Sequence, residues 1–478
     1  MARMSALPSQ TEDFPQWYGE VVRRADLAEH SLVRGAMVIK PRGYAIWEAI
    51  QRALDDRIKA TGHENLYFPL LVPLSVLEQE GDLVEGFAPE IAVVTHAGGA
   101  KLEQPLAIRP TSEAVIWATY ARWIQSYRDL PLLFNQWANV VRWELRPRLF
   151  LRTTEFLWQE GHTAHETEQE AVAEALTILE RVYADVVENV MAVPVLRGRK
   201  SAGERFPGAV ETYTIEALMR DGKALQAGTS HYLGDGFART YGVRYTGRSG
   251  VEAYPYATSW GITTRLVGAL IMTHGDDRGL RLPPAVAPVG VVIVPIHGDA
   301  DRARILEAAA AIRARLEGAG LRVSVDDRDA RPGFKFADWE LKGAPLRLDL
   351  GKRDLDGGVV TLVRRDTLTS ETSSIDAIEA SVAALLDSIQ SELSAQARAR
   401  RAAQTFEPAT RGELQELMRA AAGFASAGWC GSTECEARVK AETAATIRCL
   451  PLEAELPDGA CIVCGRPAAE RATWAQAY

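Results

Sequence analysis

The sequence has no cysteine before residue 430 and no long apolar run. All of its five cysteines lie between residues 430 and 464, so the chain lacks the spread of half-cystines typical of a secreted disulfide framework. No stretch approaches the roughly 18 apolar residues that indicate a membrane helix. The first residues, MARMSALPSQTEDF, contain no apolar core of signal-peptide length. We therefore expect a soluble, cytoplasmic protein without a membrane contact.

An excess of basic residues is also lacking. Lysine and arginine number 54 against 63 aspartates and glutamates, a net charge of −9, so any nucleic-acid contact must come from local basic patches. Hydrophobic residues make up 47% and charged residues 24%, close to the globular average. A chain of 478 residues is too long for a single core, and we expect two to four domains.

The pattern of apolar residues changes along the chain. Residues 1–280 hold eight of the eleven tryptophans, and they mix strands and helices without a βαβ period, which predicts an α+β domain. A proline-rich stretch, RLPPAVAP at 281–288, predicts a linker. Residues 289–395 alternate strands and helices as in a small α/β domain with a partly parallel sheet, with a helix over 374–393 capped by Ser373 and Asp376. Residues 396–478 form a third, cysteine-bearing segment.

Four of the cysteines are arranged as two close pairs about 25 residues apart. Cys430 and Cys435 form one pair, and Cys461 and Cys464 form the other, which suits a tetrahedral zinc site. Four thiolates leave no open position, so the zinc would be structural and would supply folding energy to a segment with little apolar core of its own. The alternative is two buried pairs of free thiols. Cys449 is expected to be a packed thiol.

The strongest chemical pattern is VVRWELRPRLFLRTTEFLWQEGHTAH, residues 140–165. Arg142 and Glu144 stand two apart, so on a strand they project from the same face. After a loop at 145–151, a second strand is expected to carry Arg152, Phe156, Trp158 and Glu160 on one face. Guanidinium, carboxylate and aromatic groups aligned this way can clamp a phosphate and stack a base. The alternative is a hairpin with a charged outer face, which has little reason to display two aromatic rings.

Arg142-x-Glu144, a loop, and then Arg152 and Phe156 resemble motif 2 of class II aminoacyl-tRNA synthetases. RPTSE at 109–113, EGHTAH at 160–165 and QAGTSHYLG at 226–234 resemble prolyl-tRNA synthetases in particular, and the four-cysteine tail is similar to that of the archaeal/eukaryotic-like type. The resemblance covers nearly the whole chain. LYFPLLVP near Pro69 looks like motif 1, which implies a homodimer. SWGITTRLVGAL resembles motif 3 but lacks its repeated glycines.

The resemblance implies ATP-dependent attachment of L-proline to tRNA(Pro), through a prolyl-adenylate. Arg142 and Arg265 would be the catalytic residues, bridging the α-phosphate and contacting the γ-phosphate, with Mg²⁺ between the phosphates. The adenine would lie between Phe156 and Arg265. Further ATP contacts are implied for Glu144, Arg152, Thr154, Gln226 and Thr229.

The resemblance also implies a proline pocket. The two N–H groups of the prolyl ammonium would meet the Thr111 hydroxyl and the Glu113 carboxylate, although a mere surface loop at 109–113 is the alternative. Trp158 and Phe206 would wall the ring. His231, in the pocket by its context, could instead be a satisfied core histidine. Arg142 and Glu160 complete the set.

The second domain carries charged residues that could read the anticodon. Glu340, Arg347 and Asp354 are the candidates by resemblance, since arginine and carboxylate groups match guanine edges; a solvated charged face is the alternative. Only 98 residues separate Glu160 from Ser259, too few for an added editing domain, so we expect no editing in cis. Tyr478 resembles the family's terminal tyrosine.

Three other functions remain open. The first is another synthetase of the same class, a threonyl or glycyl enzyme; a threonyl enzyme would use a catalytic zinc with cysteine and histidine ligands, and the catalytic half contains no cysteine. A non-catalytic tRNA-binding paralogue would not need the intact arginines. A zinc-dependent hydrolase would need an open metal site.

Overall fold

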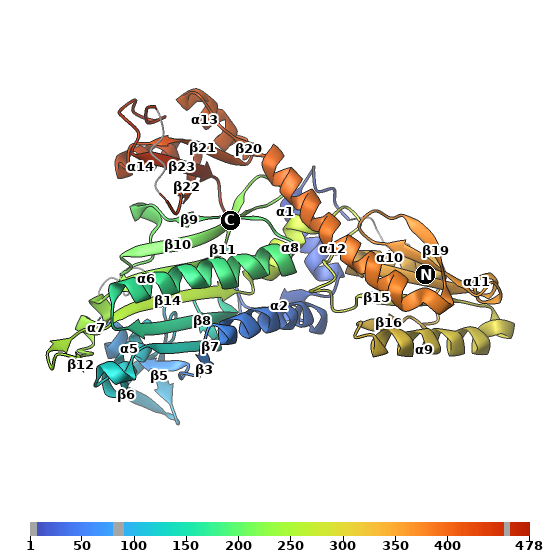
Figure 1. The fold of residues 1–478 in the computed structure, drawn as a ribbon, viewed down its shortest axis with the longest axis horizontal. Helices are drawn as coiled ribbons and strands as arrows, with labels where there is room; N and C mark the ends of the chain where they lie inside the picture. Colours follow the sequence, from blue (N-terminus) through green and yellow to red (C-terminus); the bar gives the residue numbers. More distant parts are fainter. Residues whose placement is uncertain (1–6, 80–89, 454–458) are drawn as a thin grey trace.

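A computed structural model describes residues 7–79, 90–453 and 459–478 of the chain. Among these residues the largest sheet has seven strands, in the order β3-β7-β8-β14-β11-β10-β9 (Figure 1). All neighbours are antiparallel except β3 and β7. The strands are β3 Glu64–Asn65, β7 Leu132–Val141, β8 Glu155–His165, β9 Val195–Arg199, β10 Glu211–Leu218, β11 Ala224–Gly234 and β14 Tyr256–Thr263.

Helices cover one face of this sheet. Figure 1 shows α2 (Pro41–Ala60) and α6 (Glu168–Thr177) lying across it, and α6 continues as π-helical turns over Ile178–Ala184 and Val186–Val190. The hydroxyl of Tyr183 is hydrogen-bonded to the side-chain amide of Gln159 on β8 at 2.7 Å, so the odd-numbered residues of β8 face the helices. The even-numbered residues therefore face the other side, where the candidate site lies. Helices α1 (Phe14–Arg24) and α8 (Arg265–His274) complete this core.

The expected hairpin at 140–165 differs from the structure at its ends. β7 stops at Val141 and β8 starts at Glu155, so Arg142, Glu144 and Arg152 lie on the connecting loop. Beyond Val141, one more hydrogen bond joins the two strands: the N–H of Arg142 donates to the Thr154 carbonyl at 2.8 Å. The next amide, of Trp143, donates to Glu90 instead.

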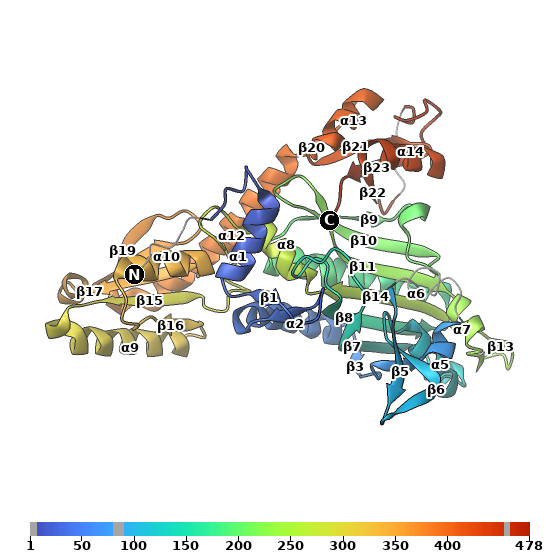
Figure 2. The same cartoon turned by 180° about the vertical axis from the view of Figure 1, so that it is seen from behind.

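The second sheet has the order β16-β15-β17-β18-β19. β15 pairs in parallel with both β16 and β17, and the remaining pairs are antiparallel, which confirms a partly parallel sheet. Figure 2 shows this sheet set beside the first, with its helices on its faces. Its elements are β15 Val291–Ile296, α9 Arg302–Gly318, β16 Val323–Val325, α10 Pro332–Lys342, β17 Leu346–Gly351, α11 Lys352–Asp356, β18 Val359–Arg364, β19 Ser370–Ser374 and α12 Ile378–Ala403.

The helix expected over 374–393 begins later and runs further. Its capping prediction was wrong: Ser374, not Ser373, accepts from the amide of Asp376 at 3.2 Å, and this bond closes a 3-10 turn before α12 starts at Ile378. The Ser373 hydroxyl instead donates to Ser381 at 2.8 Å. Because α12 continues to Ala403, the expected domain boundary at 395 falls inside it.

The third sheet, β20-β21-β23-β22, contains its own core, which corrects the expectation of a segment with little apolar core. Trp429, Trp474, Leu414, Met418 and Ile447 are all buried in it. The cysteines are therefore added to a packed unit. Its elements are β20 Thr405–Phe406, α13 Arg411–Arg419, β21 Phe424–Trp429, α14 Thr433–Thr443, β22 Thr446–Cys449 and β23 Glu470–Ala475.

Smaller elements flank the central sheet. They are β1 Ala28–His30, β2 Met37–Ile39, β4 Leu71–Pro73, α3 Leu74–Leu77, β5 Ala92–Ala97, β6 Ala100–Ile108, α5 Glu113–Trp123, α7 Gly236–Thr240, β12 Tyr245–Thr246 and β13 Glu252–Ala253. Within the described ranges, no helix has both the length and the apolar character needed to cross a bilayer.

Candidate active site and metal centre

A cavity of about 440 Å³ lies on the face of the central sheet that the helices leave open. Every candidate for ATP or proline contacts lines it, with the single exception of Thr154. These residues are Thr111, Glu113, Arg142, Glu144, Arg152, Phe156, Trp158, Glu160, Phe206, Gln226, Thr229, His231 and Arg265. The sheet register brings them together from distant parts of the chain, since Trp158 on β8 lies opposite Thr263 on β14, and Thr229 on β11 lies opposite Gly261.

The segment 109–113 is buried, which excludes the surface-loop alternative. Arg109 is fully buried because its guanidinium donates to the carbonyls of Phe68 (2.6 Å) and Asn139 (2.9 Å) and so ties the turn to the sheet. Thr111 donates its hydroxyl to Glu113 Oε2. The Thr111 oxygen then keeps its lone pairs for a further donor. Thr111 and Glu113 therefore present acceptor atoms to the cavity.

Behind this pair, Glu160 is held by three neighbours. Ser112 donates to Glu160 Oε1 at 2.6 Å, Gln136 donates to the same oxygen, and His162 Nε2 lies 2.9 Å from Oε2. Burial lowers the pKa of His162, but the hydrogen bond and charge of Glu160 outweigh it and raise the pKa overall. A charged His162 would fix Glu160 as an anion beside the cavity.

The opposite wall is aromatic. The rings of Phe206 and His231 stack with 4.6 Å between their centres and 28° between their planes. Thr212 Oγ1 lies 3.0 Å from His231 Nδ1 and also accepts the amide of Phe206 at 3.1 Å. Burial lowers the pKa of His231 to about 3, so the ring is neutral. His231 is thus satisfied at one nitrogen and still lines the cavity.

Two arginines add positive charge to the cavity. Arg142 donates Nε to the carbonyl of Pro110 at 2.9 Å, and Arg265 donates Nε to that of Leu151 at 3.1 Å. Burial, together with the charges of Arg152 and Arg142, lowers the pKa of Arg265 to about 10. Both groups remain charged near neutrality. Their mutual repulsion makes the space around them favourable for a polyanion.

Aromatic rings lie beside these charges. The guanidinium carbon of Arg142 is 5.6 Å from the ring centres of both Phe156 and Trp158. Trp158 and Ser259 line the cavity. Their buried polar atoms, Trp158 Nε1 and Ser259 Oγ, have no hydrogen-bond partner among the described residues, although buried polar atoms normally find one.

The remaining nucleotide candidates differ in position. Glu144, Arg152, Gln226 and Thr229 line the cavity. Thr154 lies behind the wall: its hydroxyl is 3.4 Å from the amide of Glu144, and a side chain on Gly35 would collide with it. Thr154 therefore positions the loop that carries Arg142 and Glu144 and does not reach the cavity.

Sequence reasoning missed Ser112, Gln136 and His162. His162 continues the period-2 pattern of Trp158 and Glu160, and that signal could have revealed it. Gln136 becomes relevant only through the register that sets it opposite Glu160. Ser112 lies within RPTSE but acts on a residue 48 positions away.

The anticodon candidates are only partly brought together. Arg347 Nη1 is 3.4 Å from Glu340 Oε1, and its guanidinium lies 3.8 Å from the ring centre of Phe336. Asp354 is at the far end of β17, where it accepts the amide of Gly351 at 2.9 Å. Asp349, which accepts from Arg347 Nε at 2.9 Å, is the nearer carboxylate.

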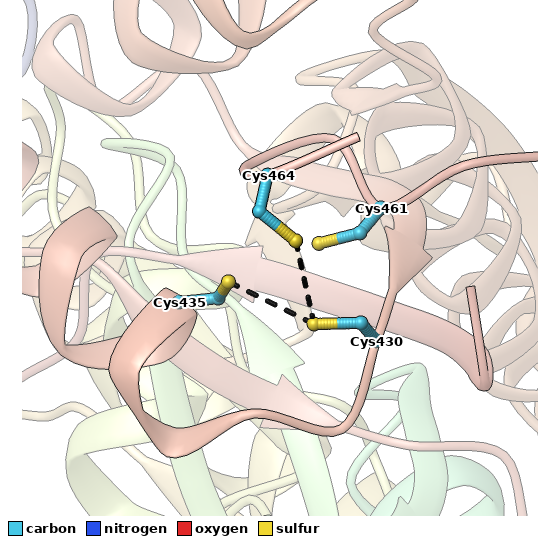
Figure 3. A group of neighbouring side chains, drawn as sticks. All are labelled: Cys430, Cys435, Cys461 and Cys464. Atoms are coloured by element: carbon cyan, nitrogen blue, oxygen red, sulfur yellow. Dashed lines mark hydrogen bonds between the residues drawn. The ribbon is translucent and has the colours of Figure 1, made fainter. Parts of the chain in front are cut away.

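Four cysteine thiols converge at one end of the third sheet. The sulfur atoms of Cys430, Cys435, Cys461 and Cys464 all lie within 4.8 Å of one another, and Figure 3 shows them pointing to a common centre. The Cys430–Cys435 and Cys430–Cys464 sulfur separations are both 3.7 Å. A tetrahedral zinc with bonds of about 2.3 Å requires sulfur atoms roughly 3.8 Å apart. The four thiols therefore fit such an ion.

Arg466 supports the thiolate form of this cluster. Its guanidinium lies 3.4 Å from the sulfur of Cys464 and 3.6 Å from that of Cys430. The hydrogen bond from Arg466 lowers the pKa of Cys464 to about 6. Cys449 is buried apart from the cluster, 3.6 Å from the carbonyl of Leu450.

Three protein families match successive parts of the chain. Residues 99–274 match the family described as tRNA synthetase class II core domain (G, H, P, S and T). Residues 290–385 match the family Anticodon binding domain, and residues 412–478 match Prolyl-tRNA synthetase, C-terminal. Each match covers all or most strands of one of the three sheets described above.

Curated relatives match over the full length. Proline--tRNA ligase of Porphyromonas gingivalis is 53% identical over 491 aligned residues, covering 99% of both chains. The enzyme of that name from Roseiflexus castenholzii is 53% identical and covers 98% of both, and that from Bacteroides fragilis is 53% identical and covers 99% of both. With its class II core, anticodon-binding and C-terminal domains, the chain belongs to the proline--tRNA ligase family.

Proposed function

We propose that the protein joins L-proline to tRNA(Pro) in two steps, first forming prolyl-adenylate from proline and ATP and then transferring the prolyl group to the 3′ end of the tRNA. The observation that carries this proposal is the cavity, which brings the acceptor pair Thr111 and Glu113 together with the guanidinium groups of Arg142 and Arg265. Proline, whose ammonium lies beside its carboxylate, and ATP, with its triphosphate, match that set of charged groups.

In the first step the proline carboxylate attacks the α-phosphorus of ATP and pyrophosphate leaves. The nucleophile is already an anion, so no side chain needs to remove a proton, and the protein must position two anions against each other. Arg142 bridges the carboxylate and the α-phosphate, and Arg265 takes the γ-phosphate. Mg²⁺ supplies further charge neutralisation on the phosphates when it is bound.

The nucleotide base belongs beside Phe156. The guanidinium of Arg142 lies over the Phe156 ring. The adenine would stack between the Phe156 ring and the guanidinium of Arg265. Glu144, Arg152, Gln226 and Thr229 surround the same space and complete the nucleotide site.

The prolyl ring belongs between Trp158 and the Phe206–His231 pair. Its secondary ammonium has two N–H donors, which the Thr111 oxygen and the Glu113 carboxylate accept, and Glu160 adds negative charge behind them. Alanine is smaller, and the loss of one or two methylenes is worth only about 1–3 kcal/mol, so alanine enters. Residues 166–255 build α6 to β13, including strands β9, β10 and β11 of the central sheet, which supports the absence of an editing domain in that interval.

The metal is proposed to be a structural zinc. The sulfur separations and the supporting Arg466 fit a tetrahedral ion that all four thiolates saturate. This cluster also supports grouping the protein with the archaeal/eukaryotic-like type. It holds the C-terminal unit together and takes no part in the reaction.

For tRNA we propose that Glu340 and Arg347 contact guanines of the anticodon, with Asp354 at the far edge of the same surface. We further propose a homodimer in the cytoplasm, where its substrates meet. Exposed apolar residues near the motif 1 segment, Tyr67 at 66% and Leu71 at 45% exposure, support a covered surface there.

Charging of a tRNA(Pro) transcript with labelled proline tests the proposal. We expect proline attachment that depends on ATP, and Arg347→Ala should raise the KM for tRNA by about 5- to 150-fold, as a lost guanine contact does, while leaving adenylate formation intact. Arg304→Ala, an exposed ion-pair residue on α9, is the matched control. Equal KM values for tRNA in Arg347→Ala and Arg304→Ala would argue against Arg347 as a base contact.

A further inference from the structure

One wall of the proline end is a short segment, Ser201–Phe206. It contains a single 3-10 turn at Ala202–Glu204, closed by the amide of Glu204 on the carbonyl of Ser201 at 3.1 Å. Glu204, Arg205 and Phe206 line the cavity. A segment this short has little internal support, so its position depends on what it contacts.

Phe206 contacts Thr212 and His231 of the central sheet, and the rest of the turn is contacted by the C-terminal unit. The hydroxyl of Ser201 donates to Glu436 Oε1 on α14 at 2.6 Å, in a buried position. A Cβ on Gly203 would lie 3.3 Å from Glu436 Oε2, so the turn packs directly on this carboxylate. Arg448 on β22 donates Nη1 to Glu204 at 3.4 Å. Lys440 on α14 also places its Nζ 3.6 Å from Glu204 Oε1. Three residues more than 230 positions away thus contact this wall.

Arg448 is itself fixed to the catalytic sheet. Its guanidinium donates to both carboxylate oxygens of Glu216 on β10, at 3.2 and 3.1 Å, and Lys200 reaches Glu216 at 2.5 Å. Buried ion pairs of this kind are costly to break and fix orientation. The backbones of Arg199 and Leu450 also exchange two hydrogen bonds, of 2.8 and 2.9 Å. The C-terminal unit is therefore docked rigidly behind the proline end.

The cysteine cluster shares a helix with this contact. Cys435 lies on α14 and directly precedes Glu436. The position of the Glu436 carboxylate, which holds Ser201, therefore depends on where the four thiols hold α14.

We propose that Glu436 and Arg448 are positioning residues for proline binding, which hold the segment Ser201–Phe206 so that Phe206 stays stacked on His231. Neither residue lines the cavity. Loss of the Glu436 contact frees the turn, and the aromatic wall must then be ordered again each time proline binds. The nucleotide end, on the loop 142–152 and on Arg265, has no contact with Glu436 in the described residues and keeps its geometry. The inference rests on the proposed function, because it concerns the same proline site.

The test compares Glu436→Ala, Glu436→Gln and Glu442→Ala in the full chain. Glu442 is the matched control, since it also lies on α14 but, within the described part of the chain, bonds only to Arg411 and Gln415 of the C-terminal unit. Glu436→Ala should raise the KM for proline about tenfold, as expected for a lost hydrogen bond to a charged group, with the KM for ATP within about twofold. Glu436→Gln keeps an acceptor oxygen for Ser201 and should restore most of the proline affinity.

Hydrogen exchange of residues 201–206 gives a second readout that does not depend on catalysis. The amides of Glu204 and Phe206 should exchange at least several times faster in Glu436→Ala than in Glu442→Ala. Ser201→Ala removes the other partner of the bond and should behave in the same way if Glu436→Ala fails to fold.

The inference is overturned if the proline KM stays at the parent value, if the proline and ATP constants rise together, or if exchange at 201–206 is equal in the Glu436 and Glu442 variants. Absence of proline-dependent activity in the parent chain would instead count against the proposed function, and the exchange comparison would still decide the inference.

Discussion

The guanidinium of Arg142 lies 5.6 Å from the centre of the Phe156 ring, and its Nε is anchored by the carbonyl of Pro110 at 2.9 Å. The anchor and the ring fix the orientation of the guanidinium. In the proposed reaction Arg142 would present a preorganised fork to the point where the carboxylate and the α-phosphate meet, which would make it the most sensitive residue of the site.

Substitution of Arg142 by lysine keeps the charge and loses the fork. Removing one preorganised donor of this kind lowers kcat by about 10²- to 10³-fold, and Arg142→Lys should show that loss in proline-dependent ATP–pyrophosphate exchange. The melting temperature should change little, because the residue lines a cavity. Activity within threefold of the parent would exclude Arg142 from the bridging role.

Glu113→Gln should act on proline and spare ATP. The amide removes the negative charge that faces the prolyl ammonium, while its size is unchanged. A charge-assisted hydrogen bond contributes about 1.5–3 kcal/mol, so the KM for proline should rise by about 10- to 150-fold. Separate titrations of proline and ATP in the exchange reaction measure the effect. A parallel rise in both constants would place Glu113 in a structural role only.

The residues of this site differ in how well they can be predicted from the sequence. RPTSE and the strand of Trp158 and Glu160 were visible as patterns, because each lies within one short segment. Ser112, Gln136 and His162 were not, because their role depends on the pairing of β7 with β8, and a register between strands is set by the whole sheet. The side chain of Thr154 illustrates the same limit. Its spacing fits the motif, yet the loop turns it toward Gly35 and away from the cavity.

The third sheet shows a similar limit at the level of fold. Its two buried tryptophans, Trp429 and Trp474, lie 45 residues apart in a segment whose pattern is dominated by charges and cysteines. Only the pairing of β21 with β23 brings them into one core. The four cysteines were easier to interpret, because metal ligands come in short, regular pairs.

Removal of the metal should destabilise this third unit without unfolding the rest. Cys435→Ser should abolish retention of one zinc per chain and lower the melting temperature of the C-terminal unit by several degrees, since metal binding contributes folding energy. Cys449→Ser is the matched control, because Cys449 lies outside the cluster, and it should retain zinc. Metal analysis and calorimetry measure both. Equal zinc content in the two variants would refute the assignment of the ligands.

Buried neutral histidines make stability depend on pH. Burial lowers the pKa of His274 to about 3, and its Nε2 donates to the carbonyl of Met191 at 2.9 Å. In the unfolded chain a histidine titrates near pH 6.5. The unfolded state therefore gains a proton below about pH 6.5 that the folded state does not bind until about pH 3, so stability falls as the pH decreases through this window, by about 1.4 kcal/mol per pH unit for each such histidine.

His274→Gln should remove one of these protons. It should lower stability at neutral pH, and it should make the fall in unfolding free energy between about pH 5.5 and pH 4 less steep, by about 1.4 kcal/mol per pH unit. Denaturant titrations at several pH values give the slope. An unchanged slope would mean that His274 is already charged in the folded protein.

The central claim is that one cavity joins an acceptor pair for a cyclic ammonium to an arginine pair for a triphosphate. Amino-acid-dependent ATP–pyrophosphate exchange by the purified chain, run in parallel with proline, threonine and alanine, tests it most directly. The account predicts strong exchange with proline, weak exchange with alanine and none above background with threonine. Exchange that depends on threonine, or no exchange with any of the three, would contradict it.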